Sequence, residues 1–529
     1  NTYTGGTFIN NGILLLKDRN RLYSSGAVTV NGGIFDLGGF AQQVGAVTLL
    51  TGTIRNGNLS GASYDFQSGT VSAVVADGGA GATAVNKTTG GSVTMTEINS
   101  YTGGTNVTAG TLTLVQANAL FRTGVINVSG GTFDLGGVAQ KTGLVTLTGG
   151  TISHGTLNAS GYTLKNGTIS AVIGDVTSPA VATAINKVTD GTVGGGTVVL
   201  TSVNTYAGGT NVTGGTLQLT INGALPTGRA LLVNGGTLDL TTTAQSVSTL
   251  QITSGEITSS TGTIVVTGGT PFFDLQGGTV SAILAGTAAA TKSGAGTTIL
   301  SGANTYSGLT SVNAGILQLG RTDALKTTGS ITLNGGTLDL STFDQTTNVL
   351  TLLGGAITGT GNLNASSYAL QAGSIAIALG GASVPVYKTT GGVVTLSGAN
   401  TYGGGTYLQG GSFFVGSSTV LDGGNAIVSG PLGTGLITVT SGTGIGTSSA
   451  TGQTLANNLV MLSTGANSVY LGNGGAGMLT LNGNFNLNGS APTSITVYNP
   501  VTLGGVVSGG AVTLAAGSSS TLTLKGANT

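Results

Sequence analysis

The sequence NSYTGGTNVTAGTLTL, from Asn99 to Leu114, decides the fold, because close copies of it return at regular intervals along the chain. The copies open with Asn-Thr-Tyr or Asn-Ser-Tyr and recur about every 100 residues, at Asn1, Asn99, Asn204, Asn304 and Asn400. Self-similarity at a fixed period indicates a repeat array instead of separate globular domains. We therefore expect one continuous unit over residues 1–529, with internal repeats 1–98, 99–203, 204–303, 304–399 and a divergent 400–527.

A shorter rhythm lies inside each long repeat, in which an alternating apolar run, a glycine pair and a second alternating run follow one another. The second runs return at similar short intervals, beginning at Thr111, Thr132, Thr151, Thr168, Thr197, Thr216 and Thr237. Alternation with period two is typical of strands, and no stretch shows the apolar spacing of a helix. The pattern predicts an all-β solenoid of short strands of four or five residues, with about 20 residues per coil and almost no α-helix.

The composition supports a packed chain and excludes several classes of function. Glycine contributes 99 of 529 residues without the every-third spacing of collagen, and 39% hydrophobic residues with zero net charge argue against disorder. Fifteen basic and fifteen acidic residues leave no basic surface for nucleic acid. The chain has no cysteine and no uninterrupted apolar run of about 18 residues, so we expect no disulfide and no membrane span.

Several polar and aromatic side chains recur once per long repeat, which indicates architectural roles. An aspartate in Gly-Gly-x-x-Asp-Leu is predicted to bind backbone donors in a turn, at Asp36, Asp134, Asp239 and Asp339. A glutamine is predicted to form amide bonds near a turn, at Gln42, Gln140, Gln245 and Gln345. The marker tyrosine is interpreted as packing at a coil corner, with an exposed contact stripe as the alternative, at Tyr3, Tyr101, Tyr206, Tyr306 and Tyr402. Each repeat also has an aromatic coil (Tyr64, Tyr162, Phe272, Tyr368) and then a lysine (Lys87, Lys187, Lys292, Lys388).

No arrangement of residues predicts a catalytic, cofactor-binding or metal site. His154 is the only histidine, which supports neither a Ser-His-Asp triad nor a multi-histidine metal site. The repeated aspartates lie about five coils, or roughly 24 Å, apart, whereas two-carboxylate glycoside hydrolysis needs roughly 5–10 Å. The strings Gly78-Gly-Ala-Gly and Gly474-Gly-Ala-Gly lack the aspartate of a calcium-binding β-roll. We therefore expect no enzyme activity and no cofactor.

The marker motif carries a family resemblance. The strings NTYTGGT (from Asn1) and SGANTYSGLT (from Ser301), followed by Ala-Gly-Ile/Thr-Leu-x-Leu and then Asn-Ala-Leu or Asp-Ala-Leu, resemble the autotransporter-associated β-strand repeat of bacterial autotransporter passengers and giant secreted surface proteins. The resemblance covers all five repeats and is strongest at 99–125 and 300–325. It implies a right-handed parallel β-helix that is exported across the outer membrane and displayed on the bacterial cell surface.

From these observations we expect a structural extracellular fibre or stalk that supports adhesion, aggregation or a biofilm matrix. Ordinary repeat sequence at residues 1–16 and 512–529, ending in the marker letters Asn528-Thr529, predicts continuation into further repeats or end-to-end self-association. The alternatives are a passenger adhesin that binds host or surface glycans, a passive spacer, and a polysaccharide-degrading β-helix enzyme.

Overall fold

The protein is described here by a computed structural model that covers residues 1–79, 81–176, 182–266, 272–462, 467–489 and 491–527. The chain forms two compact units, Asn1–Gly268 and Gly269–Thr529, whose boundary falls inside the third sequence repeat. Each unit is described by itself, and the single uninterrupted solenoid over residues 1–529 stays a prediction. Asn528 and Thr529, which would open a further marker, lie outside the described residues.

The first unit contains short strands and a few long ones. Its strands are β1 (Thr7–Ile9), β2 (Ile13–Leu15), β3 (Val28–Phe66), β4 (Gly69–Asp77), β5 (Val85–Lys87), β6 (Ser92–Met95), β7 (Thr105–Val107), β8 (Thr111–Leu114), β9 (Ile126–Val128), β10 (Thr132–Asp134), β11 (Ala139–Leu147), β12 (Thr151–Ser153), β13 (Thr156–Leu164), β14 (Gly167–Ile169), β15 (Val172–Asp175), β16 (Ile185–Lys187), β17 (Thr197–Leu200), β18 (Thr210–Val212), β19 (Thr216–Leu219), β20 (Ala230–Asp239), β21 (Ala244–Val247), β22 (Thr249–Thr258) and β23 (Thr263–Val266).

The second unit is built in the same way. Its strands are β24 (Phe272–Leu275), β25 (Gly278–Val280), β26 (Ile283–Gly286), β27 (Ala289–Lys292), β28 (Thr297–Leu300), β29 (Thr310–Val312), β30 (Ile316–Leu319), β31 (Ile331–Asp339), β32 (Gln345–Thr358), β33 (Asn362–Leu370), β34 (Gly373–Ile375), β35 (Ala378–Gly380), β36 (Val386–Lys388), β37 (Val393–Leu396), β38 (Thr406–Leu408), β39 (Ser412–Val415), β40 (Val420–Leu421), β41 (Ile427–Ser429), β42 (Ile437–Val439), β43 (Thr443–Thr447), β44 (Gln453–Leu455), β45 (Leu459–Met461), β46 (Asn467–Gly474), β47 (Leu479–Leu481), β48 (Phe485–Asn486), β49 (Thr493–Val497), β50 (Val501–Leu503), β51 (Val507–Ser508), β52 (Val512–Leu514) and β53 (Leu522–Leu524).

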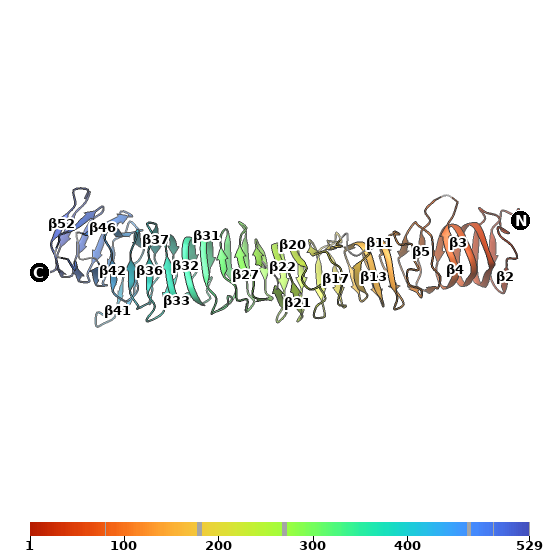
Figure 1. The fold of residues 1–529 in the computed structure, drawn as a ribbon, viewed down its shortest axis with the longest axis horizontal. Helices are drawn as coiled ribbons and strands as arrows, with labels where there is room; N and C mark the ends of the chain where they lie inside the picture. The colour runs from red at the N-terminus through yellow and green to blue at the C-terminus, as the bar shows by residue number, and fades with distance from the viewer. Residues whose placement is uncertain (80, 177–181, 267–271, 463–466, 490, 528–529) are drawn as a thin grey trace. The chain divides into compact units, whose positions relative to one another are not determined.

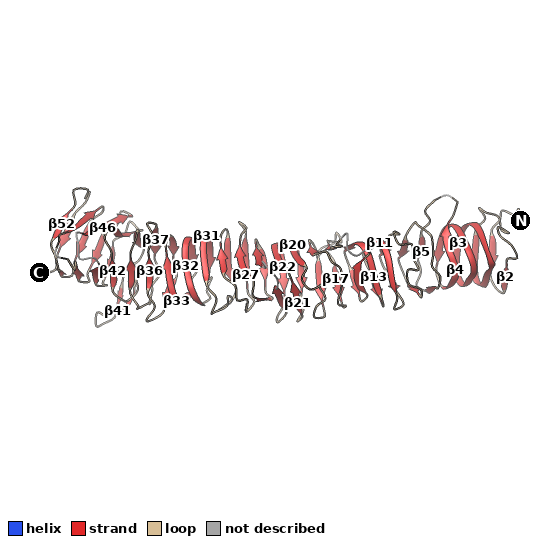
Figure 2. Ribbon diagram, in the orientation of Figure 1, coloured by secondary structure: helices blue, strands red, loops and turns tan. Residues whose placement is uncertain are grey.

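Both units are parallel β-solenoids, and the described residues contain strands and loops but no helix (Figure 2). Within each unit the strands of successive coils follow one another in chain order along the stack (Figure 1). Thr105 of β7 pairs with Ile126 of β9, and Thr132 of β10 pairs with Thr151 of β12, so each pair joins equivalent points of successive coils. The predicted all-β solenoid, with about 20 residues per coil, is therefore confirmed.

The alternation of each strand separates a buried ladder from an outer one. Leu112, Phe133 and Ile152 occupy paired positions in β8, β10 and β12, and all three are fully buried. On the outer side of the same strands, threonines follow one another at half-buried positions, Thr111, Thr132, Thr151 and Thr168. β-Branched side chains suit this pleated, half-buried surface, so the register of each coil is held on both faces.

The expected strand length of four or five residues is wrong for parts of both units. β3 runs for 39 residues, about two coils, and β32 for 14. Such strands pass corners without interruption because glycines at positive φ, such as Gly52 at 109° in β3, turn the backbone there. A Cβ at Gly52 would lie 2.3 Å from the Gly33 oxygen of the neighbouring coil, so only glycine fits.

Several coils of the fifth sequence repeat are longer than the usual coil. Thr406 of β38 pairs with Ile437 of β42, and Asn467 of β46 pairs with Thr493 of β49, whereas Thr105 of β7 pairs with Ile126 of β9. A long coil also occurs in the first unit, where Gly167 of β14 pairs with Val198 of β17. Part of the added length forms a small antiparallel hairpin of β40 and β41. The repeat keeps the parallel ladder of the solenoid while its loops grow.

The marker asparagines bind the backbone of the neighbouring coils at a corner. The Oδ1 atom of Asn304 accepts a hydrogen bond from the backbone N–H of Leu284 (2.8 Å), and its Nδ2 atom donates to the carbonyl of Ala324 (2.8 Å). Three other marker asparagines, all buried, make the same pair of bonds: Asn99, Asn204 and Asn400. Because buried backbone groups must be paired, this amide secures three successive coils at once.

The substitution Asn304→Ala tests this role. It leaves the Leu284 N–H without its side-chain acceptor, whereas the Ala324 carbonyl still accepts from the Asn304 backbone N–H, so we expect a loss of about 1–3 kcal/mol of stability. The urea midpoint should fall and hydrogen exchange of the Leu284 amide should accelerate. Asn313→Ala is the matched control, because Asn313 is exposed and its side chain bonds to the Asn334 side chain. Equal midpoints for the two variants would contradict the role.

Candidate functional site

Four of the five marker tyrosines are buried at coil corners. Tyr101, Tyr206, Tyr306 and Tyr402 are at most 1% exposed, and each hydroxyl lies 2.7–2.9 Å from the Oγ1 atom of the threonine four residues later. Burial raises the pKa of Tyr306 to about 12, so its phenol is neutral. Tyr3 makes the same bond to Thr7 (2.5 Å) but is 42% exposed, since it lies in the first coil of the described chain. These positions do not form an exposed stripe.

The repeated aspartates bind turns and cross to a neighbouring coil. Each Oδ1 atom accepts a hydrogen bond of 2.8–2.9 Å from the backbone N–H two residues later, as Asp36 does from Gly38. Burial opposes ionisation of Asp36, but hydrogen bonds from Gly38, Arg55 and Asn56 hold its pKa below the usual value. The corresponding cross-coil partners of Asp134, Asp239 and Asp339 are His154, Gln218 and Gln318. His154 thus serves as an exposed partner of Asp134 (3.1 Å) at a positive φ of 47°.

The repeated glutamines are buried amide bridges between coils. In Gln245, the Oε1 atom accepts from the Leu225 N–H (3.0 Å), and the Nε2 atom donates to the Ile221 carbonyl (2.9 Å). The same acceptor bond, to the leucine of an Ala-Leu segment in the preceding coil, is made by Gln140 and Gln345, and Gln42 makes it to the leucine of Arg21-Leu22. All four are at most 1% exposed. They secure the segments that follow the marker.

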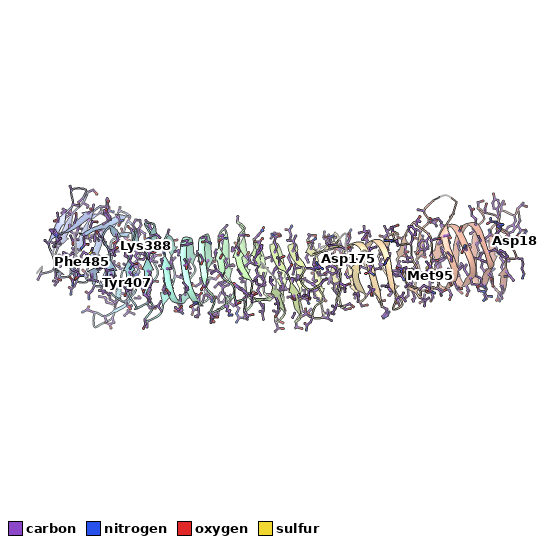
Figure 3. All side chains as sticks on the ribbon, in the orientation of Figure 1. Asp18, Met95, Asp175, Lys388, Tyr407 and Phe485 are labelled. Carbon is purple, nitrogen blue, oxygen red and sulfur yellow. The ribbon has the colours of Figure 1, made fainter. Side chains whose placement is uncertain are left out.

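The four lysines are completely buried, which the sequence did not indicate. The Nζ atom of Lys388, labelled in Figure 3, donates to the carbonyls of Gln371 (2.9 Å) and Thr390 (2.8 Å). Lys187 donates to three carbonyls, those of Val188, Gly195 and Gly214. Burial lowers the pKa of Lys187 and Lys388 to about 8. The ammonium groups therefore satisfy carbonyls of neighbouring turns and are not displayed for chemistry.

The buried aromatic of the third repeat is Phe273, so the assignment of Phe272 was wrong by one residue. Phe273 is fully buried and its ring lies 5.5 Å from that of Tyr306, whereas Phe272 is 44% exposed. The phenols of Tyr64, Tyr162 and Tyr368 bind two backbone carbonyls each. Phe273 has no hydroxyl to do so. A one-residue shift in a strand reverses which side chain faces the core.

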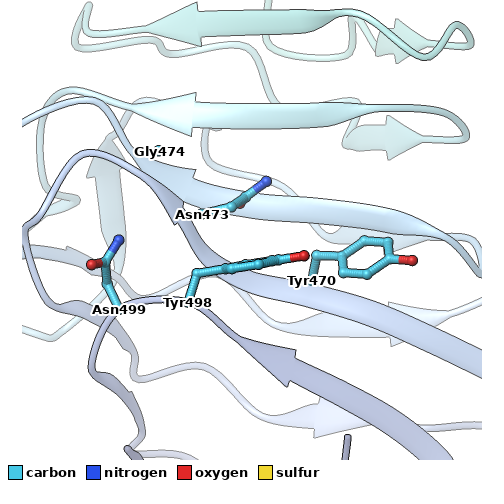
Figure 4. A pocket seen from close by; sticks show the side chains of 5 residues that line it. All are labelled: Tyr470, Asn473, Gly474, Tyr498 and Asn499. Atoms are coloured by element: carbon cyan, nitrogen blue, oxygen red, sulfur yellow. The ribbon is translucent and has the colours of Figure 1, made fainter. Parts of the chain in front are cut away.

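A groove of about 360 Å³ lies in the fifth repeat and is the candidate functional site. Figure 4 shows the side chains that line it, which come from β46 and from the residues after β49: Tyr470, Asn473, Gly474, Tyr498 and Asn499. The two tyrosine rings lie 6.4 Å apart at an angle of 35°. None of these five residues is charged, so the groove is neutral and partly aromatic.

Two glycines shape this groove, Gly446 in β43 and the bulge residue Gly472 in β46. β43 and β46 shift register between Ile445 and Gly446, where Gly472 (φ 69°) is the extra residue of β46. A Cβ at Gly446 would lie 1.6 Å from the Asn473 oxygen, so the close approach of the two strands requires glycine. Bulges re-aim side chains next to functional sites. Here the bulge places Asn473 beside the tyrosines.

Hydrogen bonds fix the amides and leave other groups of the groove unpaired. Asn499 donates from Nδ2 to the carbonyls of Gly472 (2.5 Å) and Gly475 (2.7 Å), and Asn473 donates to the Ser412 hydroxyl (3.0 Å). Within the described part of the chain, neither the hydroxyls of Tyr470 and Tyr498 nor the Asn499 Oδ1 atom has a hydrogen-bond partner. The groove thus combines two aromatic rings with available hydroxyl and carbonyl groups.

Sequence reasoning identified the fifth repeat as divergent but missed the groove. A signal was present, because a Val-Tyr pair occurs in two alternating runs, Val469-Tyr470 and Val497-Tyr498, that belong to successive coils. No group of three histidine, aspartate or glutamate side chains in the described residues is placed to share a metal ion. Across the same residues, no helix has the length and hydropathy needed to cross a membrane.

Comparison with protein families finds the passenger-associated-transport-repeat in five segments, residues 1–16, 85–114, 193–219, 291–319 and 387–413. Each segment contains a marker asparagine, its tyrosine and the threonine that binds the tyrosine hydroxyl. The matched segments are therefore the corners described above. The resemblance to an autotransporter passenger repeat is confirmed.

A curated relative, the adhesin BmaC autotransporter of Brucella suis biovar 1 (strain 1330), is 31% identical over 306 residues. The match covers 50% of this chain and 8% of the relative, so the chain corresponds to a small part of that protein. No solved structure matches the chain significantly. Together the repeat and the relative indicate a secreted, surface-exposed protein that contains autotransporter passenger repeats.

The buried lysines predict a pH dependence of stability. Below pH 8, Lys388 is protonated in both the folded and the unfolded protein; between pH 8 and its ordinary value of 10.5, only the unfolded protein keeps the proton. Stability should therefore rise with pH across this window relative to Lys388→Met. Thermal midpoints measured across the same window check this, with exposed Lys525→Met as control. A Lys388→Met profile parallel to that of the unmodified chain would contradict the prediction.

Proposed function

We propose that this chain is a non-catalytic segment of a surface-displayed passenger, which holds binding surfaces away from the cell and supports adhesion. The observation that carries the proposal is that the passenger-repeat matches coincide with corners whose polar side chains bind neighbouring coils. The aspartates, glutamines and buried lysines of the repeats are likewise engaged with turns and backbone. A solenoid stabilised in this way is suited to extension and display.

Two observations favour an adhesive segment over a passive spacer. The relative that matches half of the chain is named an adhesin. The fifth repeat also departs from the regular coil to form a groove with exposed polar and aromatic groups. A spacer has no need for such a departure. Polysaccharide hydrolysis, the remaining alternative, gains no support from the repeated aspartates, because each binds a turn and a partner in a neighbouring coil.

An adhesion assay tests this function. Beads coated with the folded 1–529 chain should adhere to epithelial monolayers or to glycan-coated surfaces more than beads coated with an equal mass of albumin. The same preparation should release no reducing ends from a panel of polysaccharides. Adherence equal to that of albumin beads would favour a spacer, and saturable hydrolysis by the folded chain would favour an enzyme.

We also propose that copies of this solenoid associate end to end or that the solenoid continues into further repeats. Successive coils are joined by parallel strand pairing, as between β7 and β9. The edge of a strand paired in this way binds a further strand readily.

Electron microscopy of the purified chain over a concentration series separates these two cases. Filaments that lengthen with concentration are expected if copies stack on one another. Particles of one uniform length at every concentration would exclude stacking of copies and leave continuation into further repeats.

A further inference from the structure

We infer that the groove formed by Tyr470, Asn473, Gly474, Tyr498 and Asn499 binds a neutral sugar ring. This inference rests on the proposed adhesive function and names the ligand class of its site. The groove measures about 360 Å³, within the roughly 300–1,000 Å³ range of small-ligand pockets. In this groove a tyrosine pair and two side-chain amides line the same hollow.

The chemistry of the groove fits a pyranose better than a charged ligand. A pyranose ring has an apolar C–H face that packs on aromatic rings, and hydroxyls around its edge. The tyrosine rings supply apolar faces, and their hydroxyls can donate or accept hydrogen bonds. The Asn499 Oδ1 atom, held in place because Nδ2 bonds to Gly472 and Gly475, supplies a further acceptor.

The lining residues also argue against other ligand classes. Among the described residues, no lysine or arginine lines the groove to neutralise a phosphate, sulfate or acidic sugar, and no carboxylate lines it to bind a divalent cation. Tyr470 and Tyr498 belong to neighbouring coils, so the spacing of the coils sets the distance between their rings. The site is therefore preorganised by the solenoid, which lowers the cost of ordering it on binding.

A second tyrosine pair provides a matched control. Tyr387 in β36 and Tyr407 in β38 are paired residues on the outer surface, and their rings stack 5.0 Å apart at 21° (Tyr407 is labelled in Figure 3). Neither residue lines the groove. Replacement of this pair removes two tyrosine rings, one more than Tyr498→Ala removes, from the same unit without changing the groove.

The test is binding of neutral saccharides to the full chain. Binding is measured by calorimetry and by the change in tyrosine fluorescence. The chain has 13 tyrosines and no tryptophan, so tryptophan emission does not mask the tyrosine signal. The probes are lactose, maltotriose, cellotriose and N,N′-diacetylchitobiose, with galacturonic acid oligomers as the acidic comparison. We expect at least one neutral probe to bind, with Tyr498→Ala weakening it by at least about tenfold and Tyr498→Phe by less.

Two controls separate a loss of saccharide binding from a loss of folding or of tyrosine rings elsewhere. Tyr498 is 44% exposed, so Tyr498→Ala should keep the circular dichroism spectrum and melting temperature of the unmodified chain. The double variant Tyr387→Ala/Tyr407→Ala should bind normally. Absence of binding by every neutral probe, stronger binding of the acidic oligomers, or an equal loss in the control double variant would overturn the inference. Adhesion of beads without saccharide binding would also overturn it, while leaving the adhesive function intact.

Discussion

Every corner of a parallel coil leaves backbone N–H and carbonyl groups that the strand ladder does not pair, and the structure depends on binding them. Asn304 does so with one amide that joins three coils, and Gln245 does so with another. Lys388 satisfies carbonyls with a buried ammonium, and Asp239 satisfies the N–H of a turn. Because unpaired buried groups are costly, these side chains must return at the same corner in successive repeats.

This use of polar residues leaves the outer surface largely neutral. The four repeat lysines are inside, where burial lowers their pKa, and four of the five marker phenols are buried, as Tyr306 is. The outer positions of the strands carry threonine ladders instead. A surface of this kind offers hydroxyl and amide contacts and little long-range electrostatic attraction.

The groove arises where the repeating pattern is relaxed. The fifth repeat lacks the Gly-Gly-x-x-Asp-Leu motif, and several of its coils are longer than the usual coil of about 20 residues. Glycine at 446 and the bulge at Gly472 then allow β46 to come close to β43 and to turn Asn473 toward the tyrosines. Regular repeats thus provide the scaffold, and one irregular repeat provides a candidate binding surface.

The sequence by itself determined the coil length, the β-strands and the recurrence of the marker, because period-two alternation and a fixed repeat length are local properties. It also indicated that Asp36 and Gln42 have architectural roles, because the same aspartate and glutamine return at the same place in each of the first four repeats. Only the tertiary structure decided that Asn304 joins three coils, that Lys388 is buried and that Phe273 faces the core. Likewise, Tyr470 and Tyr498 lie side by side only because two coils stack in a particular register. The alternation of residues along one strand does not specify which residues of the next coil it will contact.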